Sequence, residues 1–438
     1  MKIAMMTNNY KPFIGGVPLS VERLAKGLRA LGHEVCIFAP EYEGEEEPEE
    51  EDVIRYRSHK RRLSNGMVFP GMFDPCIRQE FERREFDLIH VHQPMLMGNV
   101  AKRYSRRYGI PLVFTWHTRY EEYIHYLRPF AKLNGDTKGK KKLYHTCQHI
   151  VTWYMKAYAG SCDFVFAPSR DMERYMRREE VDVPVMTLPT GLSDHSFERD
   201  EKESEKIRTQ YGAGKQSIFC TVSRIEKEKN LYFLMDAVRR FQDQCGKNFR
   251  LLVVGEGGER KNLMDYCEKI GLQDTVIFVG GVPNEEVKNY LFASDLFLFS
   301  SRSETQGIVL AEAMAAGLPA AAVEAYGVND IVRDKYNGLL CEESVDAFAE
   351  NMKKLITDRK LYEKLQKGAV QTAHFYREEK VAEEAEKGYL LAQKYVMERG
   401  KDYGYQTCEP EDFKPSFLHV SKMSLEDCED KVGRYGIL

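Results

Sequence analysis

The strongest constraint on the fold is an alternation of short apolar runs with longer amphipathic stretches, which continues over most of the chain. This rhythm is typical of βα units arranged around parallel sheets. The first series predicts strands near residues 2–7, 34–39, 88–92, 112–117, 164–168 and 185–188. The second series predicts strands near residues 217–223, 250–254, 276–279, 296–300, 320–323 and 338–341. Two successive doubly wound α/β sheets are the simplest interpretation.

The two series meet at Glu205–Gly214, a polar run with two glycines, where we expect the domain boundary. A chain of 438 residues suits two domains better than a single core. We therefore expect one domain over residues 1–205 and a second over residues 206–380. Residues 381–398 are rich in Ala, Glu, Lys and Leu and predict a long helix. The tail, residues 399–438, has no assigned role.

Composition excludes several classes of protein. Lys and Arg total 64 against 68 Asp and Glu, and the net charge of −4 argues against nucleic-acid binding by bulk charge. No apolar run reaches the roughly 18 residues of a transmembrane helix, and the first residues lack the apolar stretch of a secretory signal. The ten cysteines include no C-x-x-C pair, as expected for buried thiols in a reducing compartment. These features predict a cytoplasmic protein.

Charge is unevenly distributed in the first half of the chain. Glu41–Asp52 carries nine acids and no base, which predicts a solvated, mobile loop. Arg55–Arg62 follows with five Lys or Arg and no acid. Ala101–Lys142 holds eleven Lys or Arg against three acids, interleaved with Tyr, Phe and Trp. The two basic runs are candidates for an interaction surface.

The most informative segment is Ser303–Pro319, SETQGIVLAEAMAAGLP, which follows the apolar run Leu296–Ser300. A strand that ends in a loop and then a helix N-terminus forms a site for anions or hydroxyl groups. Glu304 lies in the loop and Glu312 eight residues later, so a helix from about Thr305 places both carboxylates on one side. The backbone amides expected at this helix start belong to Gly307, Ile308 and Val309. The alternative is an ordinary solvated helix capped by a Ser or Thr of the loop.

A second cluster, SRIEKEKN, lies at the carboxyl end of the predicted strand 217–223. Ligands of open α/β sheets bind at that end of the strands. Arg224 and Lys229 are the cations expected to neutralise a diphosphate there, Arg through a bidentate fork and Lys as a point charge. The alternative is that Glu226 and Glu228 pair with them in a solvated loop.

Two further motifs follow predicted strands of the first domain. Gly15 and Gly16, in KPFIGGVPLS, allow the backbone to approach a ligand before the helix from Val17. His117 lies at the carboxyl end of the predicted strand 112–117. Taken singly, a Gly-Gly pair is more often only a turn, and a lone His is more often structural.

Several cofactor motifs are absent. Gly255–Gly258 follows a strand but does not match G-x-G-x-x-G, so the dinucleotide fingerprint of nicotinamide oxidoreductases fails, and no Walker A sequence occurs. No Asp-x-Asp occurs, and His90, His92 and His117 have no Cys or Glu partners at zinc-motif spacings. We expect no metal site.

The second-half motifs resemble the family-four retaining nucleotide-sugar glycosyltransferases of the GT-B fold. Glu304 and Glu312 match the E-x7-E pair of that family. The resemblance implies that Glu312 holds the ribose hydroxyls of the nucleotide and that Glu304 contacts the hydroxyls of the donor sugar. Arg224 and Lys229 match the diphosphate-binding Arg and Lys at the same spacing, which implies that they stabilise the charge of the leaving group.

The first-half motifs extend the resemblance over about residues 1–395. Gly15 and Gly16 match the glycine loop of the family, whose amides, with those near Gly307, would contact the diphosphate. His117 matches a His that lines the donor sugar, facing sugar or acceptor. The resemblance implies two Rossmann-like doubly wound domains facing a cleft. The N-terminal domain would bind the acceptor, the C-terminal domain the nucleotide sugar, and the helix over 381–398 would cross back to the N-terminal domain.

The resemblance also implies a mechanism. No second carboxylate is evident as a covalent nucleophile, so a same-face, retaining displacement is expected. The leaving phosphate would assist deprotonation of the acceptor, the donor would be a UDP-sugar, and neither a metal nor another cofactor is expected.

Finer similarities indicate the acceptor. The segment FTWHTRYEEYIHY, Gln306 and the PTG of Pro189–Gly191 resemble the bacterial diacylglycerol glucosyltransferases, which implies glucose transfer to 1,2-diacylglycerol. The basic runs suit a surface that rests on anionic lipid, with aromatic side chains dipping into the interface. The candidate membrane-facing residues are Arg61, Arg62, Trp116, Tyr120, Tyr123, Tyr126, Lys140, Lys141 and Lys142. We expect a peripheral location on the inner face of the cell membrane; the alternative keeps the aromatics in the domain core and the bases on a solvated face.

Two other functions stay in competition. An enzyme of the same family with a soluble sugar or polysaccharide acceptor would have no affinity for anionic vesicles. A non-catalytic nucleotide- or nucleic-acid-binding protein would bind RNA or DNA with a steep salt dependence and turn over no UDP-sugar.

Overall fold

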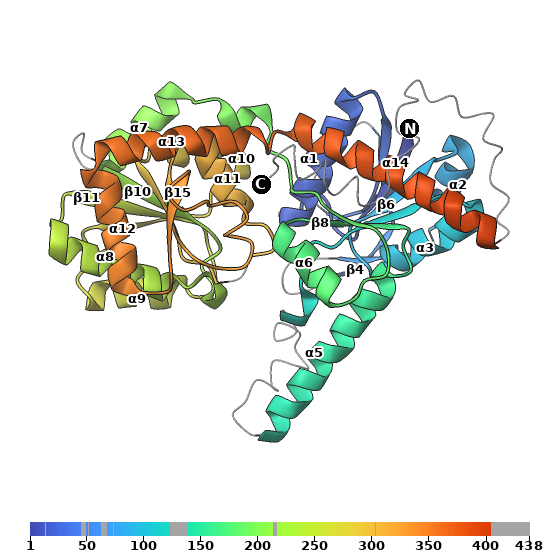
Figure 1. Cartoon of the computed structure of the whole chain (residues 1–438), viewed down its shortest axis with the longest axis horizontal. Coiled ribbons are helices and arrows are strands. Elements are labelled where there is room, and N and C mark those ends of the chain that lie inside the picture. The colour runs from blue at the N-terminus through green and yellow to red at the C-terminus, as the bar shows by residue number, and fades with distance from the viewer. Residues whose placement is uncertain are drawn as a thin grey trace. The chain divides into compact units, whose positions relative to one another are not determined.

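The computed structural model of the chain describes residues 1–13, 15–44, 50, 52–62, 68–72, 74–122, 138–212, 217–302 and 304–403 (Figure 1). The chain forms two compact units, one of residues 1–191 with residues from 379 onward and the other of residues 192–378. Each unit is an α/β domain built on a parallel sheet, as the alternation of apolar runs predicts.

The sheet of the first unit has seven strands in the order β3-β2-β1-β6-β7-β8-β9, all parallel. The strands are β1 (Lys2–Met6), β2 (Glu34–Pro40), β3 (Val53–Tyr56), β6 (Leu88–Val91), β7 (Leu112–Thr115), β8 (Phe164–Ala167) and β9 (Val185–Thr187). A separate antiparallel hairpin joins β4 (Ser58–Arg62) to β5 (Val68–Pro70). The central strands are buried at every residue, which explains why they are mostly apolar, with His90 and Thr115 as the polar exceptions.

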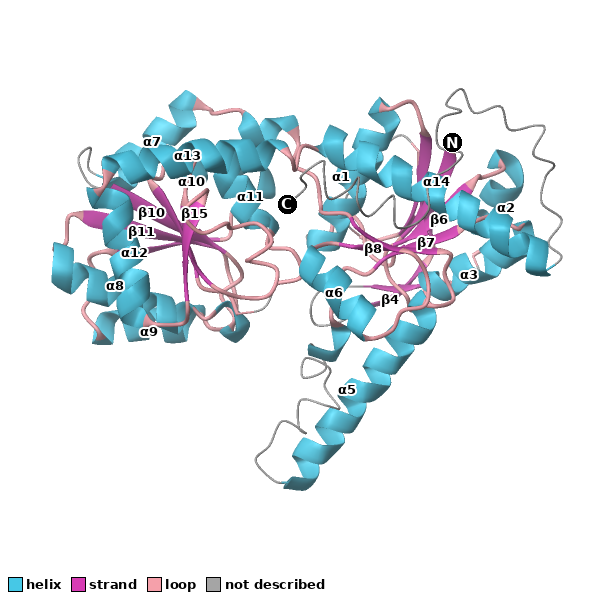
Figure 2. Cartoon of the chain, viewed as in Figure 1, coloured by secondary structure: helices cyan, strands magenta, loops and turns pink. Residues whose placement is uncertain are grey.

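Helices cover both faces of this sheet (Figure 2). On one face α1 (Gly16–Ala30) and α14 (Glu378–Tyr403) enclose one core with the strands. On the other face a second core is closed by α2 (Pro75–Arg84), α3 (Met97–Tyr108), α5 (Lys138–Ala159) and α6 (Arg170–Arg178). The return of the C-terminal helix to this unit is the course that the family resemblance implied.

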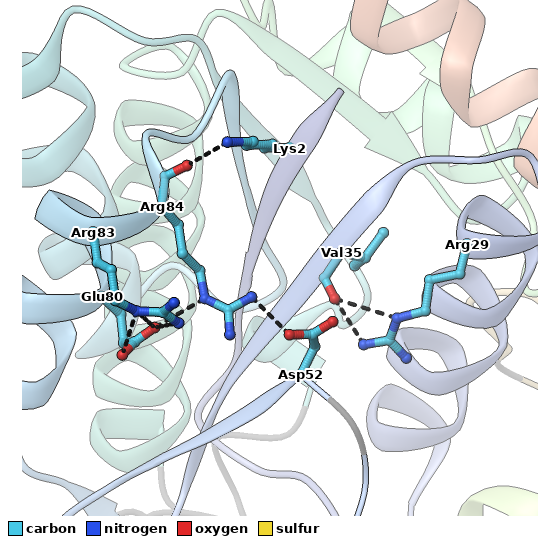
Figure 3. Close-up of polar contacts among 7 residues, drawn as sticks. All are labelled: Lys2, Arg29, Val35, Asp52, Glu80, Arg83 and Arg84. Carbon is cyan, nitrogen blue, oxygen red and sulfur yellow. Dashed lines mark hydrogen bonds and ion pairs between the residues drawn. The ribbon is translucent and has the colours of Figure 1, made fainter.

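The edge strand β3 was not predicted, because charged runs flank it and hide its short apolar pattern. An ion network holds this edge (Figure 3): Arg84 of α2 contacts Glu80 at 2.9 Å and Asp52, just before β3, at 2.7 Å. Arg55 within β3 donates to the carbonyl oxygens of Lys11 and Pro40. Asp52, at the end of the acidic run, is therefore held by a structural contact, whereas a solvated, mobile loop was predicted for Glu41–Asp52. Residues 45–49 and 51 of that run lie outside the described residues.

The second unit has a six-stranded parallel sheet in the order β12-β11-β10-β13-β14-β15. The strands are β10 (Ser217–Val222), β11 (Phe249–Val254), β12 (Val276–Gly280), β13 (Leu296–Phe299), β14 (Ala320–Val323) and β15 (Gly338–Cys341). Around it lie α7 (Glu201–Gly212), α8 (Leu231–Cys245), α9 (Arg260–Lys269), α10 (Asn284–Phe292), α11 (Ile308–Ala315), α12 (Val345–Thr357) and α13 (Arg359–His374). Two cores, one on each face, complete the doubly wound arrangement.

The boundaries between units differ from the predicted ones. The first lies after Gly191 rather than after residue 205, because α7 packs on the second sheet: Ile207 is buried with Ile218, and Arg208 pairs with Asp295. The return to the first unit begins at Glu379, close to the predicted residue 381. The predicted helix over 381–398 is part of α14, and residues 404–438 of the predicted tail lie outside the described residues.

Candidate functional site

Each sheet reverses its strand order at one point, and the predicted residues gather there. In the first unit the reversal lies between β1 and β6, and in the second between β10 and β13. Chains that leave neighbouring strands in opposite directions open a crevice at the carboxyl ends of those strands, where ligands of such sheets bind. Gly15 and Gly16 follow β1, and Lys229 and Glu304 follow β10 and β13.

In the second unit, Lys229 and Glu304 form an ion pair across the reversal. The Lys229 Nζ atom lies 2.6 Å from Glu304 Oε1, and the two side chains are only 14% and 16% exposed. The Ser300 hydroxyl, at the end of β13, donates to the carbonyl oxygen of Lys229 at 2.9 Å and ties the two loops together. Two residues that the sequence placed in separate motifs therefore form a single charged centre.

Arg224 lies in the same loop but in a different environment. Its side chain is 59% exposed and pairs with Glu228 at 2.9 Å, which is the solvated pairing that the sequence left open as the alternative. Glu226 instead accepts from the amide of Gly258, joining this loop to the GEGG loop after β11. Of the two predicted cations, Lys229 is the one held against another predicted site residue.

The helix after β13 begins later than predicted. α11 starts at Ile308, and Gly307 before it has a left-handed backbone with φ of 73°. Glu304 is therefore a loop residue and not part of the helix, whereas Glu312 is half-buried in the second turn of α11. Among the described residues no side chain caps this helix, so the amides of Gly307, Ile308 and Val309 start it without a cap from Thr305. Ser303, the other cap of the alternative, lies outside the described residues.

Gly327 supports the Glu304 loop and was not predicted. The amide of Glu304 donates to the carbonyl oxygen of Tyr326 at 3.2 Å. A Cβ at Gly327 would lie 2.4 Å from the carbonyl oxygen of Glu304, and the backbone there is left-handed, with φ of 73°. Only glycine allows this approach. The sequence signal for this glycine was a Tyr-Gly pair after a predicted strand. A glycine in the sequence does not show which backbone atom it approaches, so the contact with Glu304 could not be predicted.

In the first unit, Gly15 and Gly16 begin α1. Gly15 precedes the helix in an extended conformation, and no side chain caps the helix start. A Cβ at Gly16 would meet no atom within 4 Å, and the residue is exposed. Packing therefore leaves room beside this helix N-terminus, whose amides are oriented to meet an anion.

His117 follows β7 and contacts a histidine that follows the neighbouring strand. The Nε2 atom of His117 lies 2.9 Å from Nδ1 of His92, and the two rings are stacked with centroids 5.2 Å apart. His90 lies in β6, two residues before His92, and its ring nitrogens bond to the hydroxyls of Tyr389 and Thr115 at 2.8 and 2.7 Å. The sequence identified His117 but not its partner.

Burial keeps these three histidines neutral. It lowers the pKa of His90 and of His117 to about 3 and lowers that of His92 well below its usual value. The Nε2 atom of His92 is buried without a hydrogen-bond partner among the described residues. Since a buried N–H without an acceptor is rare, the proton of His92 is favoured on Nδ1, where it is donated to His117. His117 then carries its own proton on Nδ1 and presents a donor on its other edge.

Two of the predicted membrane-facing side chains, Trp116 and Tyr120, pack in the domain core and not on a surface. Trp116 is fully buried, with its ring 6.3 Å from that of Phe114, and Tyr120 packs against the same core, as in the alternative reading. The reason is that both side chains belong to the sheet face closed by α5 and α6. Tyr123 and Tyr126 lie outside the described residues. The backbone of Arg61 and Arg62 is in β4 and that of Lys140, Lys141 and Lys142 in α5, and their side chains lie outside the described part.

Among the described residues, no group of three or more His, Cys, Asp or Glu side chains is arranged to hold a metal ion. No helix of the described part is both long and apolar enough to cross a membrane.

Two doubly wound parallel domains, each with polar residues at its strand-order reversal, define the GT-B class of nucleotide-sugar transferases. The solved structure of Anabaena Alr3699/HepE in complex with UDP has this fold, with a TM-score of 0.65, 20% identity, and coverage of 88% of this chain and 99% of that one. The sequence model described as Glycosyltransferase Family 4 matches residues 14–195, and that of Glycosyl transferases group 1 matches residues 203–372. The two models match successive halves of the chain, and the chain therefore belongs to the family-four glycosyltransferases of the GT-B fold.

Curated relatives include two enzymes named alpha-monoglucosyldiacylglycerol synthase. The one from Streptococcus pneumoniae is 27% identical over 78% of this chain and 75% of its own length. The one from Acholeplasma laidlawii is 27% identical over 73% of this chain and 79% of its own length. A GDP-mannose-dependent alpha-mannosyltransferase of Corynebacterium glutamicum is 24% identical over 80% of each chain. The relatives thus differ in the sugar and the acceptor that their names give.

Proposed function

We propose that the chain is a retaining glucosyltransferase that moves glucose from UDP-glucose to 1,2-diacylglycerol at a membrane surface. The observation that carries the proposal is the Lys229–Glu304 pair at the strand-order reversal of the second unit. A cation for the diphosphate and a carboxylate for sugar hydroxyls are adjacent there, as they must be if one ligand carries both groups. The names of the two 27% identical relatives support glucose and diacylglycerol.

In the proposed reaction, the bond from the anomeric carbon to the diphosphate oxygen breaks as the acceptor hydroxyl oxygen attacks the same face. The acceptor proton passes to the leaving phosphate oxygen, so no protein base and no metal are needed. Lys229, Arg224 and the amides at the start of α11 stabilise the charge that develops on the diphosphate. Glu312 holds the ribose hydroxyls, and Glu304 holds the sugar hydroxyls. In the first unit, His117 donates its Nδ1 proton to an acceptor oxygen.

The ion pair decides which variant tests this proposal. Glu304→Ala would leave the Lys229 ammonium, which is largely buried, without its carboxylate and would perturb the fold as well as the site. Glu304→Gln keeps an oxygen that accepts from Lys229 and removes only the charge. Glu363→Gln, in the exposed Arg359–Glu363 pair of α13, is the matched control.

The test uses mixed micelles of diacylglycerol and an anionic phospholipid with radiolabelled UDP-glucose. We expect label in the organic phase, no loss of activity with a chelator, and a fall of about 100-fold or more in Glu304→Gln with no change in Glu363→Gln. Equal turnover in Glu304→Gln and the parent would refute the site. Release of free UDP without organic label would favour a soluble acceptor, and label only from GDP-mannose would correct the donor.

A further inference from the structure

The helix α5 exposes large apolar side chains that the proposed chemistry does not use. Leu143, Ile150 and Trp153 are 48%, 59% and 68% exposed, and Trp153 is the most exposed large hydrophobic side chain in the described part of the chain. Their spacings of seven and three residues place them along one side of the helix. We call these three residues the α5 stripe.

The rest of α5 explains why the stripe stays exposed. Met155 and Tyr158 are buried in the core of the first unit, and the Tyr158 hydroxyl donates to the carbonyl oxygen of Gly98 at 2.9 Å. Tyr154 donates to the carbonyl oxygen of Pro94. The C-terminal half of α5 is thus anchored, while its N-terminal half extends away from the sheet of its unit (Figure 1).

The charge of α5 indicates what the stripe contacts. Its 22 residues, KGKKKLYHTCQHIVTWYMKAYA, contain five lysines and no acid, and four of those lysines lie in the first five residues. Cations at a helix N-terminus are opposed by the helix dipole, so nearby negative charge would stabilise this end of α5. A basic helix with an exposed Trp, Ile and Leu is typical of segments that lie in a lipid interface.

We propose that the α5 stripe is the docking surface of this protein for anionic lipid membranes, to which the lysine-rich sequence at the start of α5 adds positive charge. A second copy of the chain is a poor occupant, because two α5 helices would bring together like charges. This proposal adds a membrane partner to the proposed function. It rests on the proposed function only where it links the membrane to a lipid acceptor. It shares Lys140, Lys141 and Lys142 with the surface predicted from the sequence, but its apolar contacts come from α5 and not from Trp116, which is buried.

The two tryptophans of the chain allow a direct test. Trp116 is fully buried and Trp153 is largely exposed, so lipid contact should change the emission of Trp153 alone. Full-length protein is mixed with phosphatidylcholine vesicles with and without phosphatidylglycerol. We expect cosedimentation only with the anionic vesicles, weakening at high salt, with a blue shift in the parent that is absent in Trp153→Phe.

Variants distinguish vesicle binding through the α5 stripe from non-specific hydrophobic binding. Leu143→Ser/Ile150→Ser/Trp153→Ser is expected to reduce vesicle binding at least tenfold. Met264→Ser/Ile356→Ser, which removes exposed apolar side chains of the second unit, is the matched control and is expected to bind as the parent does. Lys140→Gln/Lys141→Gln/Lys142→Gln should reduce both the binding and its salt dependence.

The outcomes distinguish this surface from the proposed function. Equal vesicle binding by the stripe variant and the parent would overturn the docking surface, whatever the enzyme's activity. Lipid-free dimerisation that the stripe variant abolishes would overturn it in favour of a second copy. Vesicle binding that depends on the stripe, with no label transferred to diacylglycerol, would support the surface and contradict the proposed acceptor.

Discussion

At the scale of single residues, the buried histidines of the first unit are the groups most sensitive to acid. His90 and His92 are 0% and 1% exposed. Both nitrogens of His90 are already bonded, to Tyr389 and Thr115, so a proton added to this ring would enter a site with no carboxylate to compensate it. Burial is accordingly the main cause of its lowered pKa, with His117 as a lesser one.

This arrangement predicts a loss of stability on mild acidification. In the unfolded chain His90 has a pKa near 6.5, and in the folded chain near 3, so between these values the unfolded state binds more protons. The stabilisation is therefore complete above about pH 6.5 and falls by up to about 1.4 kcal/mol per pH unit for each such histidine as the pH drops toward 3. His92 contributes in the same direction.

The measurement is the urea midpoint of the parent and of His90→Gln at about pH 7 and pH 5. The variant cannot titrate at this position, so its free energy of unfolding should fall less between the two pH values, by about 2 kcal/mol. Between about pH 7.5 and 8.5 the difference between the two proteins should be constant. If the free energy of unfolding fell equally in the parent and in His90→Gln below pH 6.5, His90 would not be the source of the acid sensitivity.

Sequence reasoning at this scale reached the residue types but not their pairings. It selected His117, Lys229 and Glu304 because each follows a predicted strand. It did not foresee that Lys229 contacts Glu304 or that His92 contacts His117. Those contacts depend on which strands are neighbours and in which register, and spacing along the chain carries no such information.

At the scale of elements, the start of α11 depends on the loop against which it packs. Helical spacing predicted a start near Thr305, three residues early, because apolar periodicity does not register the left-handed turn at Gly307. The Glu304 loop is instead shaped by the close backbone approach of Gly327. The position of Glu304 is therefore set by a residue 23 positions later in the chain, in the loop after β14.

Gly327→Ala is predicted to reduce turnover more than stability explains. The new Cβ would meet the carbonyl oxygen of Glu304 at 2.4 Å, so the loop must shift, and a displaced carboxylate should cost at least tenfold in turnover. The left-handed backbone adds a penalty of roughly 1–2 kcal/mol to folding. Turnover in the micelle assay and the urea midpoint are both measured.

Gly109→Ala is the matched control for this prediction. Gly109 follows α3 in a left-handed conformation, with φ of 67° and ψ of 27°, and a Cβ there would meet nothing within 4 Å. It should incur a similar backbone penalty without moving the loop, so its turnover should match the parent. If the two variants lost turnover equally, the close approach of Gly327 would have no role in placing Glu304.

At the scale of the whole molecule, the sequence predicted two doubly wound domains from the rhythm of apolar runs alone. The boundaries between the two domains were harder to predict from the sequence. A polar run with two glycines marked residues 205–214, but α7 within it packs on the second sheet, so the transition lies after Gly191. Composition marks where a chain is polar, whereas a boundary is set by which core each helix joins.

The last helix, α14, packs in the core of the first unit, so a substitution in α14 should destabilise the first unit and not the second. Tyr389 of α14 is fully buried and bonds to His90, and a Cβ at Gly388 would lie 2.4 Å from Cζ of Phe166 in β8. Gly388→Val would therefore overpack the core of the first unit and destabilise it by roughly 1–3 kcal/mol. Leu390→Ala, at a 46% exposed position of the same helix, is the control and should be nearly neutral.

Both tryptophans lie in the first unit, so their fluorescence follows the unfolding of that unit alone. In Gly388→Val the urea midpoint of the fluorescence signal should fall, while circular dichroism of the whole chain should gain a second, unshifted transition from residues 192–378. In Leu390→Ala both signals should remain as in the parent. An unshifted fluorescence midpoint in Gly388→Val would mean that α14 adds little to the first core. A single shared transition, lowered in both signals, would mean that the two units unfold as one and that α14 stabilises the whole chain.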